Sequence, residues 1–130
     1  MGNYASAAAN FQQVLEIDQV APVERRVQHA GHLNNLGALY RSMGELARAE
    51  PLFQQSLQIR REALGDAHPE VAQSLNNLAE LYKTMGAWRN AEQLYRQALT
   101  IDASFGRDRH PDHARHLNNL ASLYISINKP

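Results

Sequence analysis

The chain has 130 residues, with 13 Lys and Arg residues against 13 Asp and Glu residues, and it contains no cysteine. The balanced charge argues against a protein that coats nucleic acid or an anionic membrane, because both need a cationic surface. The lack of cysteine excludes disulfides, thiol nucleophiles and thiolate metal sites. No apolar run approaches the roughly 18 residues of a membrane span, and the polar, alanine-rich start lacks a secretory signal pattern. We therefore expect one domain in the cytoplasm.

The sequence repeats itself at a constant interval of 42 residues (75 − 33 and 117 − 75). The string Leu-Asn-Asn-Leu occurs three times in this register, starting at Leu33, Leu75 and Leu117. Residues 33–59 and 75–101 are identical at 14 of 27 positions, and residues 2–17 match residues 44–59 at eight of 16. A fixed period of this size is the signature of a repeat architecture, in which stacked units share one core.

In chain order, the sequence begins in the middle of a repeat. Residues 2–26 are predicted to form the second helix of a partial repeat and a linker. Two full repeats are expected at 27–68 and 69–110, and residues 111–130 are expected to form the first helix of a truncated repeat. The expected total is six helices.

Each full repeat shows the apolar spacing of two helices. In the first helices, apolar or small residues recur at i, i+3, i+4, i+7 and i+10, namely Leu33, Leu36, Gly37, Tyr40 and Met43, then Leu75, Leu78, Ala79, Tyr82 and Met85. Gly44 and Gly86 are expected to end these helices, because glycine enters the left-handed cap conformation at little cost. The second helices carry apolar residues at Leu46, Ala49, Phe53 and Leu57, then at Trp88, Ala91, Tyr95 and Leu99.

The linkers after the full repeats share a glycine and a His-Pro pair. They run from Gly65 to Pro69 and from Gly106 to Pro111. Glycine is expected to end one helix there, and proline suits the first turn of the next. Pro51 lies inside a predicted second helix, where we expect a gentle kink.

These residues resemble the tetratricopeptide repeat, a helix–turn–helix unit with a usual period of about 34 residues. The family's large, Leu, Gly/Ala and Tyr positions match Leu33, Leu36, Gly37 and Tyr40, and its small, aromatic and small positions match Ala49, Phe53 and Ser56. The longer period, the doubled asparagine and the His-Pro linker are similar to kinesin light chains in particular. The resemblance implies an all-α, TPR-type superhelical solenoid of antiparallel helix pairs that binds protein partners. The linker at residues 21–26 lacks His-Pro, and no heptad coiled coil for a motor heavy chain is present.

One face of each first helix is polar on a helical wheel, and the resemblance assigns this face to the concave surface of the stack. An asparagine amide offers both a donor and an acceptor, which suits the main chain of an extended peptide. The resemblance therefore implies an Asn-lined peptide-binding groove. The candidate contact residues are Asn34, Asn35, Arg41, Asn76, Asn77, Glu80, Lys83, Arg115, Asn118, Asn119 and Ser122. The alternative interpretation is that the asparagines hydrogen-bond between adjacent helices and serve packing only.

A second functional hypothesis is self-association, because the first and last predicted helices each lack the other half of their repeat. Position 128 corresponds to position 2 after three periods, so the last helix of one molecule and the first of another could complete one repeat. The apolar residues left without a partner helix are Tyr4, Phe11, Leu15, Leu117, Leu120 and Tyr124. The chain could equally be a segment of a longer array.

Metal binding and catalysis are not expected. His110, His113 and His116 follow a spacing of three, but the third is rotated about 240° from the first at 100° per residue, whereas a metal site needs its ligands on one face. There is no strained nucleophile turn, no phosphate-binding glycine loop and no paired carboxylate pattern. We expect no cofactor, and a protein or peptide as the partner.

Overall fold

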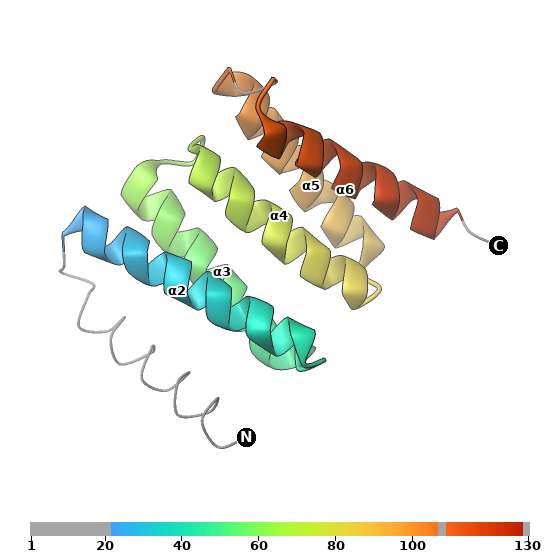
Figure 1. The fold of residues 1–130 in the computed structure, drawn as a ribbon, viewed down its shortest axis with the longest axis horizontal. Coiled ribbons are helices and arrows are strands. Elements are labelled where there is room, and N and C mark those ends of the chain that lie inside the picture. The colour runs from blue at the N-terminus through green and yellow to red at the C-terminus, as the bar shows by residue number, and fades with distance from the viewer. Residues whose placement is uncertain (1–21, 107–108, 129–130) are drawn as a thin grey trace. The chain divides into compact units, whose positions relative to one another are not determined.

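The computed structural model describes residues 22–106 and 109–128, and in these residues it contains five helices and no strand. Figure 1 shows them in chain order as α2 (Val23–Ser42), α3 (Leu46–Leu64), α4 (Pro69–Thr84), α5 (Trp88–Ser104) and α6 (Pro111–Ile127). The all-α prediction is therefore confirmed. The remaining expected helix falls in residues 1–21, outside the described residues. The chain divides into two compact units, Met1–Ala63 and Leu64–Pro130, and each is described by itself.

The first unit is built around the antiparallel pair of α2 and α3. Leu33 and Tyr40 of α2 and Phe53 of α3 are almost completely buried. The two helices approach closely at Gly37, where an added Cβ would lie 3.0 Å from the ring of Phe53. Ser56 supports the same contact, because its Oγ donates a hydrogen bond of 2.7 Å to the carbonyl oxygen of Ala30. Small residues at this helix crossing therefore allow the aromatic ring to pack against the backbone.

The second unit repeats this pair and adds a third helix. α5 packs against both α4 and α6, so it lies between the first helix of its own repeat and that of the next. The buried centre of the second unit is a cluster formed by Ala79 of α4, Ala91 and Tyr95 of α5 and Leu123 of α6. Tyr95 occupies the repeat position of Phe53, and Ala79 that of Gly37 (each 42 residues later). The same small-to-aromatic contact therefore recurs in both units.

Glycine ends the first helix of each pair, as the sequence predicts. Gly44 and Gly86 have positive φ angles of 78° and 81°. In α2 the amide N–H of Glu45 donates to the carbonyl oxygen of Tyr40 at 2.9 Å, and that of Gly44 to Arg41 at 3.0 Å. This pair of bonds is the Schellman motif, which satisfies carbonyl groups that a helix end otherwise leaves exposed.

The His-Pro pair begins the first helix of the following repeat. Nδ1 of His68 accepts a hydrogen bond of 3.1 Å from the amide N–H of Glu70, and Nδ1 of His110 accepts one of the same length from Asp112. Pro69 and Pro111 occupy the first position of their helices, where the backbone N–H would have no partner within the helix. The histidine is therefore a side-chain N-cap, a role that the repeated His-Pro pattern alone did not reveal.

Met43 and Met85 do not join the core, although their spacing placed them in the apolar series. Both are exposed, because each is the C-cap residue at which its helix ends. Trp88 is exposed as well, since it begins α5 beyond the packed part of the helix pair. Pro51 lies inside α3 as expected. In the part of the chain that the structure describes, no helix combines the length and apolar character needed to cross a membrane.

Candidate functional site

The polar residues predicted on α4 and α6 lie together in the second unit. Nδ2 of Asn119 donates two hydrogen bonds, one of 3.0 Å to Oδ1 of Asn76 and one of 3.1 Å to Oε1 of Glu80. Lys83 Nζ donates to Oγ of Ser122 at 2.8 Å. We call this set of five residues the α4–α6 face. Its side chains join two first helices that are one repeat apart.

Glu80 fixes the orientation of both amides on this face. An ionised carboxylate only accepts hydrogen bonds, so the atom of Asn119 that faces it must be Nδ2. The atom of Asn76 that meets the same Nδ2 must then be its oxygen. Within the described residues, these bonds leave Nδ2 of Asn76 as a donor and Oδ1 of Asn119 as an acceptor for other groups. Asn76 is only 3% exposed, so these oriented amides chiefly join α4 to α6.

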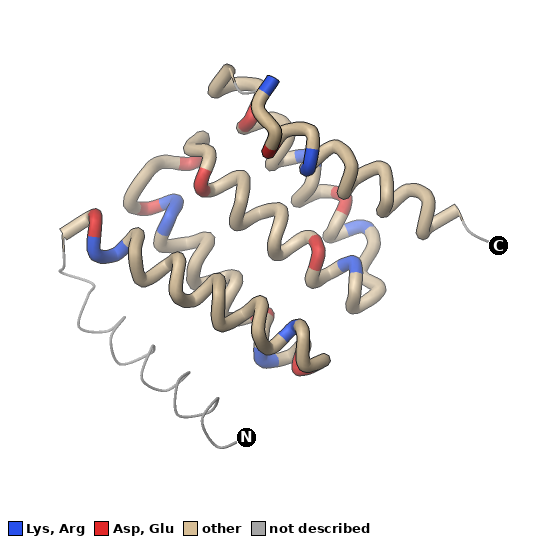
Figure 2. Tube along the Cα trace, viewed as in Figure 1, with Lys and Arg blue, Asp and Glu red and all other residues tan. Residues whose placement is uncertain are grey.

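The other residues predicted to contact a peptide from α4 and α6 differ in how exposed they are. Asn77 is half-buried and Asn118 is exposed. Arg115 is exposed and forms an ion pair of 3.4 Å with Asp112 on its own helix. Because Glu80 and Lys83 lie on the same face, its formal charges cancel, and Figure 2 shows an acidic residue followed by a basic one near the C-terminal end of α4. The face is polar without a strong field of either sign.

The predicted residues of α2 belong to the first unit. Asn34 is buried, and its Oδ1 has no hydrogen-bond partner among the described residues. Asn35 is exposed and Arg41 is half-buried. The two neighbouring asparagines of one repeat thus differ in environment, as they also do in α4 and α6. The first asparagine is the more buried one in α2 and α4, whereas the second is the more buried one in α6.

The residues predicted for self-association fall into two groups. Tyr4, Phe11 and Leu15 lie outside the described residues. In α6, Leu117 is exposed, whereas Leu120 is half-buried and packs against the central cluster of the unit. Tyr124 is also half-buried, and its hydroxyl accepts a hydrogen bond of 2.6 Å from Nη2 of Arg96. This bond is the main cause that raises the pKa of the Arg96 guanidinium.

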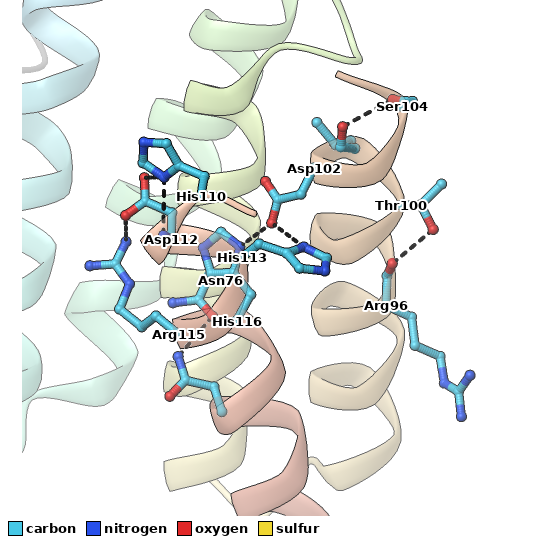
Figure 3. Close-up of polar contacts among 12 residues, drawn as sticks. Asn76, Arg96, Thr100, Asp102, Ser104, His110, Asp112, His113, Arg115 and His116 are labelled. Carbon is cyan, nitrogen blue, oxygen red and sulfur yellow. Dashed lines mark hydrogen bonds and ion pairs between the residues drawn. The ribbon is translucent and has the colours of Figure 1, made fainter. Parts of the chain in front are cut away.

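The structure also brings together a buried polar cluster that the sequence reasoning missed. Oδ2 of Asp102 lies 2.6 Å from Nδ1 of His116 and 3.3 Å from Nδ1 of His113 (Figure 3). The carboxylate oxygen accepts, so each Nδ1 carries the hydrogen. His116 and Asp102 are almost completely buried, and Nε2 of His116 has no hydrogen-bond partner among the residues that the structure describes. The cluster ties α6 to α5.

A signal for this cluster was present in the repeat register. The position 42 residues before Asp102 is Arg60, and the position 42 residues before His116 is Ser74. Both positions change in the same repeat junction, as expected for residues in contact. Within the described residues, no three His, Asp or Glu side chains are arranged to hold a metal ion. His110 instead caps α6.

Antiparallel helix pairs that recur at a constant interval, with small residues at each crossing, define a helical-repeat protein. The tetratricopeptide repeat family matches residues 28–104 of the chain, and the chain belongs to this family. The fold is therefore one used for protein–protein interaction, and repeat proteins of the kinesin-light-chain type are generally non-catalytic scaffolds. No curated protein matches the chain.

Two solved structures support the kinesin-light-chain likeness. BtubC (BKLC) from P. vanneervenii is 26% identical with a TM-score of 0.76, and the match covers 97% of this chain and 49% of that one. A Podosopora anserina protein named as a kinesin light chain with nearly identical TPR-like repeats is 25% identical with a TM-score of 0.71, covering 95% of this chain and 58% of that one. The chain thus spans about half the length of these relatives.

Proposed function

We propose that the chain is a non-catalytic interaction module that binds an extended peptide along the α4–α6 face. The observation that carries this proposal is a pair of accessible amides beside the hydrogen bond between Asn76 and Asn119, since Asn77 is half-buried and Asn118 is exposed. A peptide main chain presents an acceptor and a donor at each residue.

The binding unit in this proposal is the repeat 69–110 together with the first helix of 111–130. In the first unit, Asn34, Asn35 and Arg41 stand at the repeat positions of Asn76, Asn77 and Lys83. The proposed location is the cytoplasm, because a chain without cysteine needs no oxidising compartment.

The packing interpretation of the asparagines applies to part of the set. The hydrogen bond between Asn76 and Asn119 joins α4 to α6, so these two amides have a structural role. Asn77 and Asn118 take no part in that bond and are accessible, half-buried and exposed respectively. We therefore assign direct ligand contact chiefly to Asn77 and Asn118, and assign Asn76 and Asn119 both roles.

The test uses peptides selected on the wild-type chain from a random-sequence phage library and labelled for fluorescence anisotropy. Loss of a neutral hydrogen bond weakens binding by about 0.5–1.5 kcal/mol, so we expect Asn77→Ala with Asn118→Ala to weaken binding about tenfold. Gln93→Ala is the matched control, because Gln93 is an exposed amide on α5. Equal affinity of the double variant and the wild type would contradict the proposal.

A second measurement separates main-chain recognition from side-chain recognition. N-methylation at successive peptide bonds of a selected peptide removes one N–H donor at a time. We expect at least one methylated position to lose binding to the wild-type chain and to lose much less to the double asparagine variant. If methylation never changes the affinity, the amides do not read the peptide main chain.

A further inference from the structure

α4 and α6 begin with the same side-chain cap, and both caps depend on a histidine nitrogen that accepts a hydrogen bond. Nδ1 of His68 accepts a bond of 3.1 Å from the amide N–H of Glu70, and Nδ1 of His110 accepts one of 3.1 Å from that of Asp112. A neutral imidazole has one acceptor nitrogen, whereas both nitrogens of the protonated ring are donors. Each cap therefore exists only while its ring is neutral and carries its hydrogen on Nε2.

Protonation of either ring removes the partner of a backbone group. The first four N–H groups of a helix have no acceptor within the helix, and the cap satisfies one of them. The added positive charge also lies at the N-terminal end of the helix macrodipole, where a cation is unfavourable. Both effects make the neutral ring the better partner for the first turns of α4 and α6.

A carboxylate near His110 acts in the opposite direction, because it attracts the protonated ring. Oδ2 of Asp112 lies 3.6 Å from Nδ1 of His110, and Oδ1 of the same carboxylate lies 3.4 Å from Nη2 of Arg115 (Figure 3). These three side chains are between 36% and 51% exposed, and exposed ion pairs contribute little. α5 also brings the charged Asp102 to α6, but its Oδ2 is already bonded to His116. The loss of the cap therefore outweighs this attraction.

His68 stands in the equivalent place at the start of α4. Its ring packs against Phe105, the uncharged C-cap residue of α5, at a centroid distance of 5.8 Å. The charged residues next to His68 in the chain are Asp66 and Glu70. Glu70 precedes Asp112 by 42 residues, so each cap has a carboxylate two residues after the histidine. Both junctions thus share one arrangement of titratable groups.

We propose that His68 and His110 are a pair of proton-sensitive caps, which hold the first turns of α4 and α6 at neutral pH and release them as the pH falls. Histidine is the side chain whose charge ordinarily changes between pH 5 and 8. The stabilisation from each cap is therefore present at the upper end of this range and is lost toward the lower end. His113 and His116 behave differently, because their Nδ1 atoms donate to Asp102 and protonation at Nε2 keeps those bonds.

Thermal melting at about pH 7.5 and about pH 5.5 tests the caps, since these values lie on either side of the ordinary histidine transition. The side-chain oxygen of asparagine caps a helix without titrating. His68→Asn together with His110→Asn, the Asn-capped variant, therefore keeps both caps at both pH values. Between them, we expect the melting temperature of the wild type to fall about 5 °C more than that of the Asn-capped variant.

His32→Asn is the matched control for the melting experiment, because His32 is an exposed histidine inside α2 rather than a cap. We expect this variant to keep the pH dependence of the wild type. All other titrating groups, including the buried Asp102 cluster, are the same in the wild type and in the Asn-capped variant, so the comparison isolates the caps. Equal falls in melting temperature in these two chains would overturn the proposal.

NMR spectroscopy of the wild type tests the same geometry without any substitution. The ring ¹⁵N shifts are expected to place the hydrogen on Nε2 in both His68 and His110 at neutral pH. The amide signals of Glu70 and Asp112 are expected to move together with the titration of their own histidine, because each amide loses its acceptor. A hydrogen on Nδ1 of His68 or His110 at neutral pH would overturn the proposal, since that nitrogen could not then accept.

α4 and α6 are also the helices that carry the α4–α6 face, so the caps are expected to regulate peptide binding; this step rests on the proposed function. Between about pH 7.5 and about pH 5.5, we expect the wild type to lose more affinity for a selected peptide than the Asn-capped variant. The same loss in both chains would show that the caps do not act on this face. A wild type that binds no selected peptide at neutral pH would contradict the proposed function alone, because the melting and NMR experiments contain no peptide.

Discussion

Nδ1 of His116 lies 2.6 Å from Oδ2 of Asp102, and both side chains are almost completely buried between α5 and α6. The carboxylate also accepts a longer bond of 3.3 Å from His113, whose side chain is more accessible. A buried carboxylate is tolerated only when its hydrogen-bonding capacity is met by partners. This cluster is therefore a buried polar link between α5 and α6.

Removing the carboxylate tests this link. Asp102→Ala leaves His116 buried with neither ring nitrogen bonded, so we expect a loss of about 3 kcal/mol in the free energy of unfolding. His113→Ala is expected to cost less than half as much, because its bond is longer and water can replace it. Urea denaturation followed by circular dichroism measures both changes.

The paired apolar replacement is the matched control for this cluster. Replacing a buried polar pair with apolar residues of similar volume is often neutral. Asp102→Leu together with His116→Leu is therefore expected to recover most of the stability lost in Asp102→Ala. A double variant as unstable as the single one would mean that shape, not hydrogen bonding, determines the contribution of this site.

The histidine cap gives a second prediction. His110→Ala removes the acceptor for the amide N–H of Asp112, so the melting temperature should fall by about 4 °C, equivalent to about 1 kcal/mol. His110→Asn supplies a cap acceptor and should restore most of the loss. His68→Ala is expected to cost more, because the His68 ring also packs against Phe105 at a centroid distance of 5.8 Å. Differential scanning calorimetry distinguishes the three variants.

The sequence predicted the helix pairs because their signals are local and periodic. The apolar spacing around Leu33 and Leu75, and the glycines at 44 and 86, depend only on backbone geometry within one helix and its cap. Met43 and Met85 were misplaced for a related reason. A wheel extended to i+10 assumes that the helix continues, whereas the helix reaches its cap at those residues.

The contacts between helices were harder to predict. The wheel placed Asn76 and Asn119 on the same kind of face, but it did not pair them, since the hydrogen bond joins consecutive repeats. Rotation within one helix separated His116 from His110 and thus argued against a histidine site. That argument considered only the residues of α6. It left out Asp102, which reaches His116 from α5. Pairwise contacts depend on the packing of two helices, which periodicity does not specify.

The close approach at Gly37 predicts a size limit. An added Cβ would lie 3.0 Å from the Phe53 ring, but alanine favours the helix over glycine by about 1 kcal/mol. These effects oppose each other, so Gly37→Ala should change stability by less than about 1 kcal/mol. Gly37→Leu cannot fit without displacing the ring, and we expect it to cost at least about 2 kcal/mol. Equal stability of the glycine and leucine chains in urea would show that the helices are not in contact there.

Asn76 of α4 and Asn118 of α6 occupy the same repeat position and provide the last prediction. We expect Asn76 to have a structural role and Asn118 a role in binding. Asn76→Ala removes the acceptor of Asn119 from a buried site, whereas Asn118 is exposed and stands at the same repeat position. Both variants gain the same helix propensity, so the difference between them isolates the hydrogen bond. We expect Asn76→Ala to be about 1 kcal/mol less stable than Asn118→Ala in urea denaturation. Asn118→Ala should instead weaken peptide binding with no loss of stability. If the two variants have equal stability, the Asn76–Asn119 bond does not hold α4 to α6.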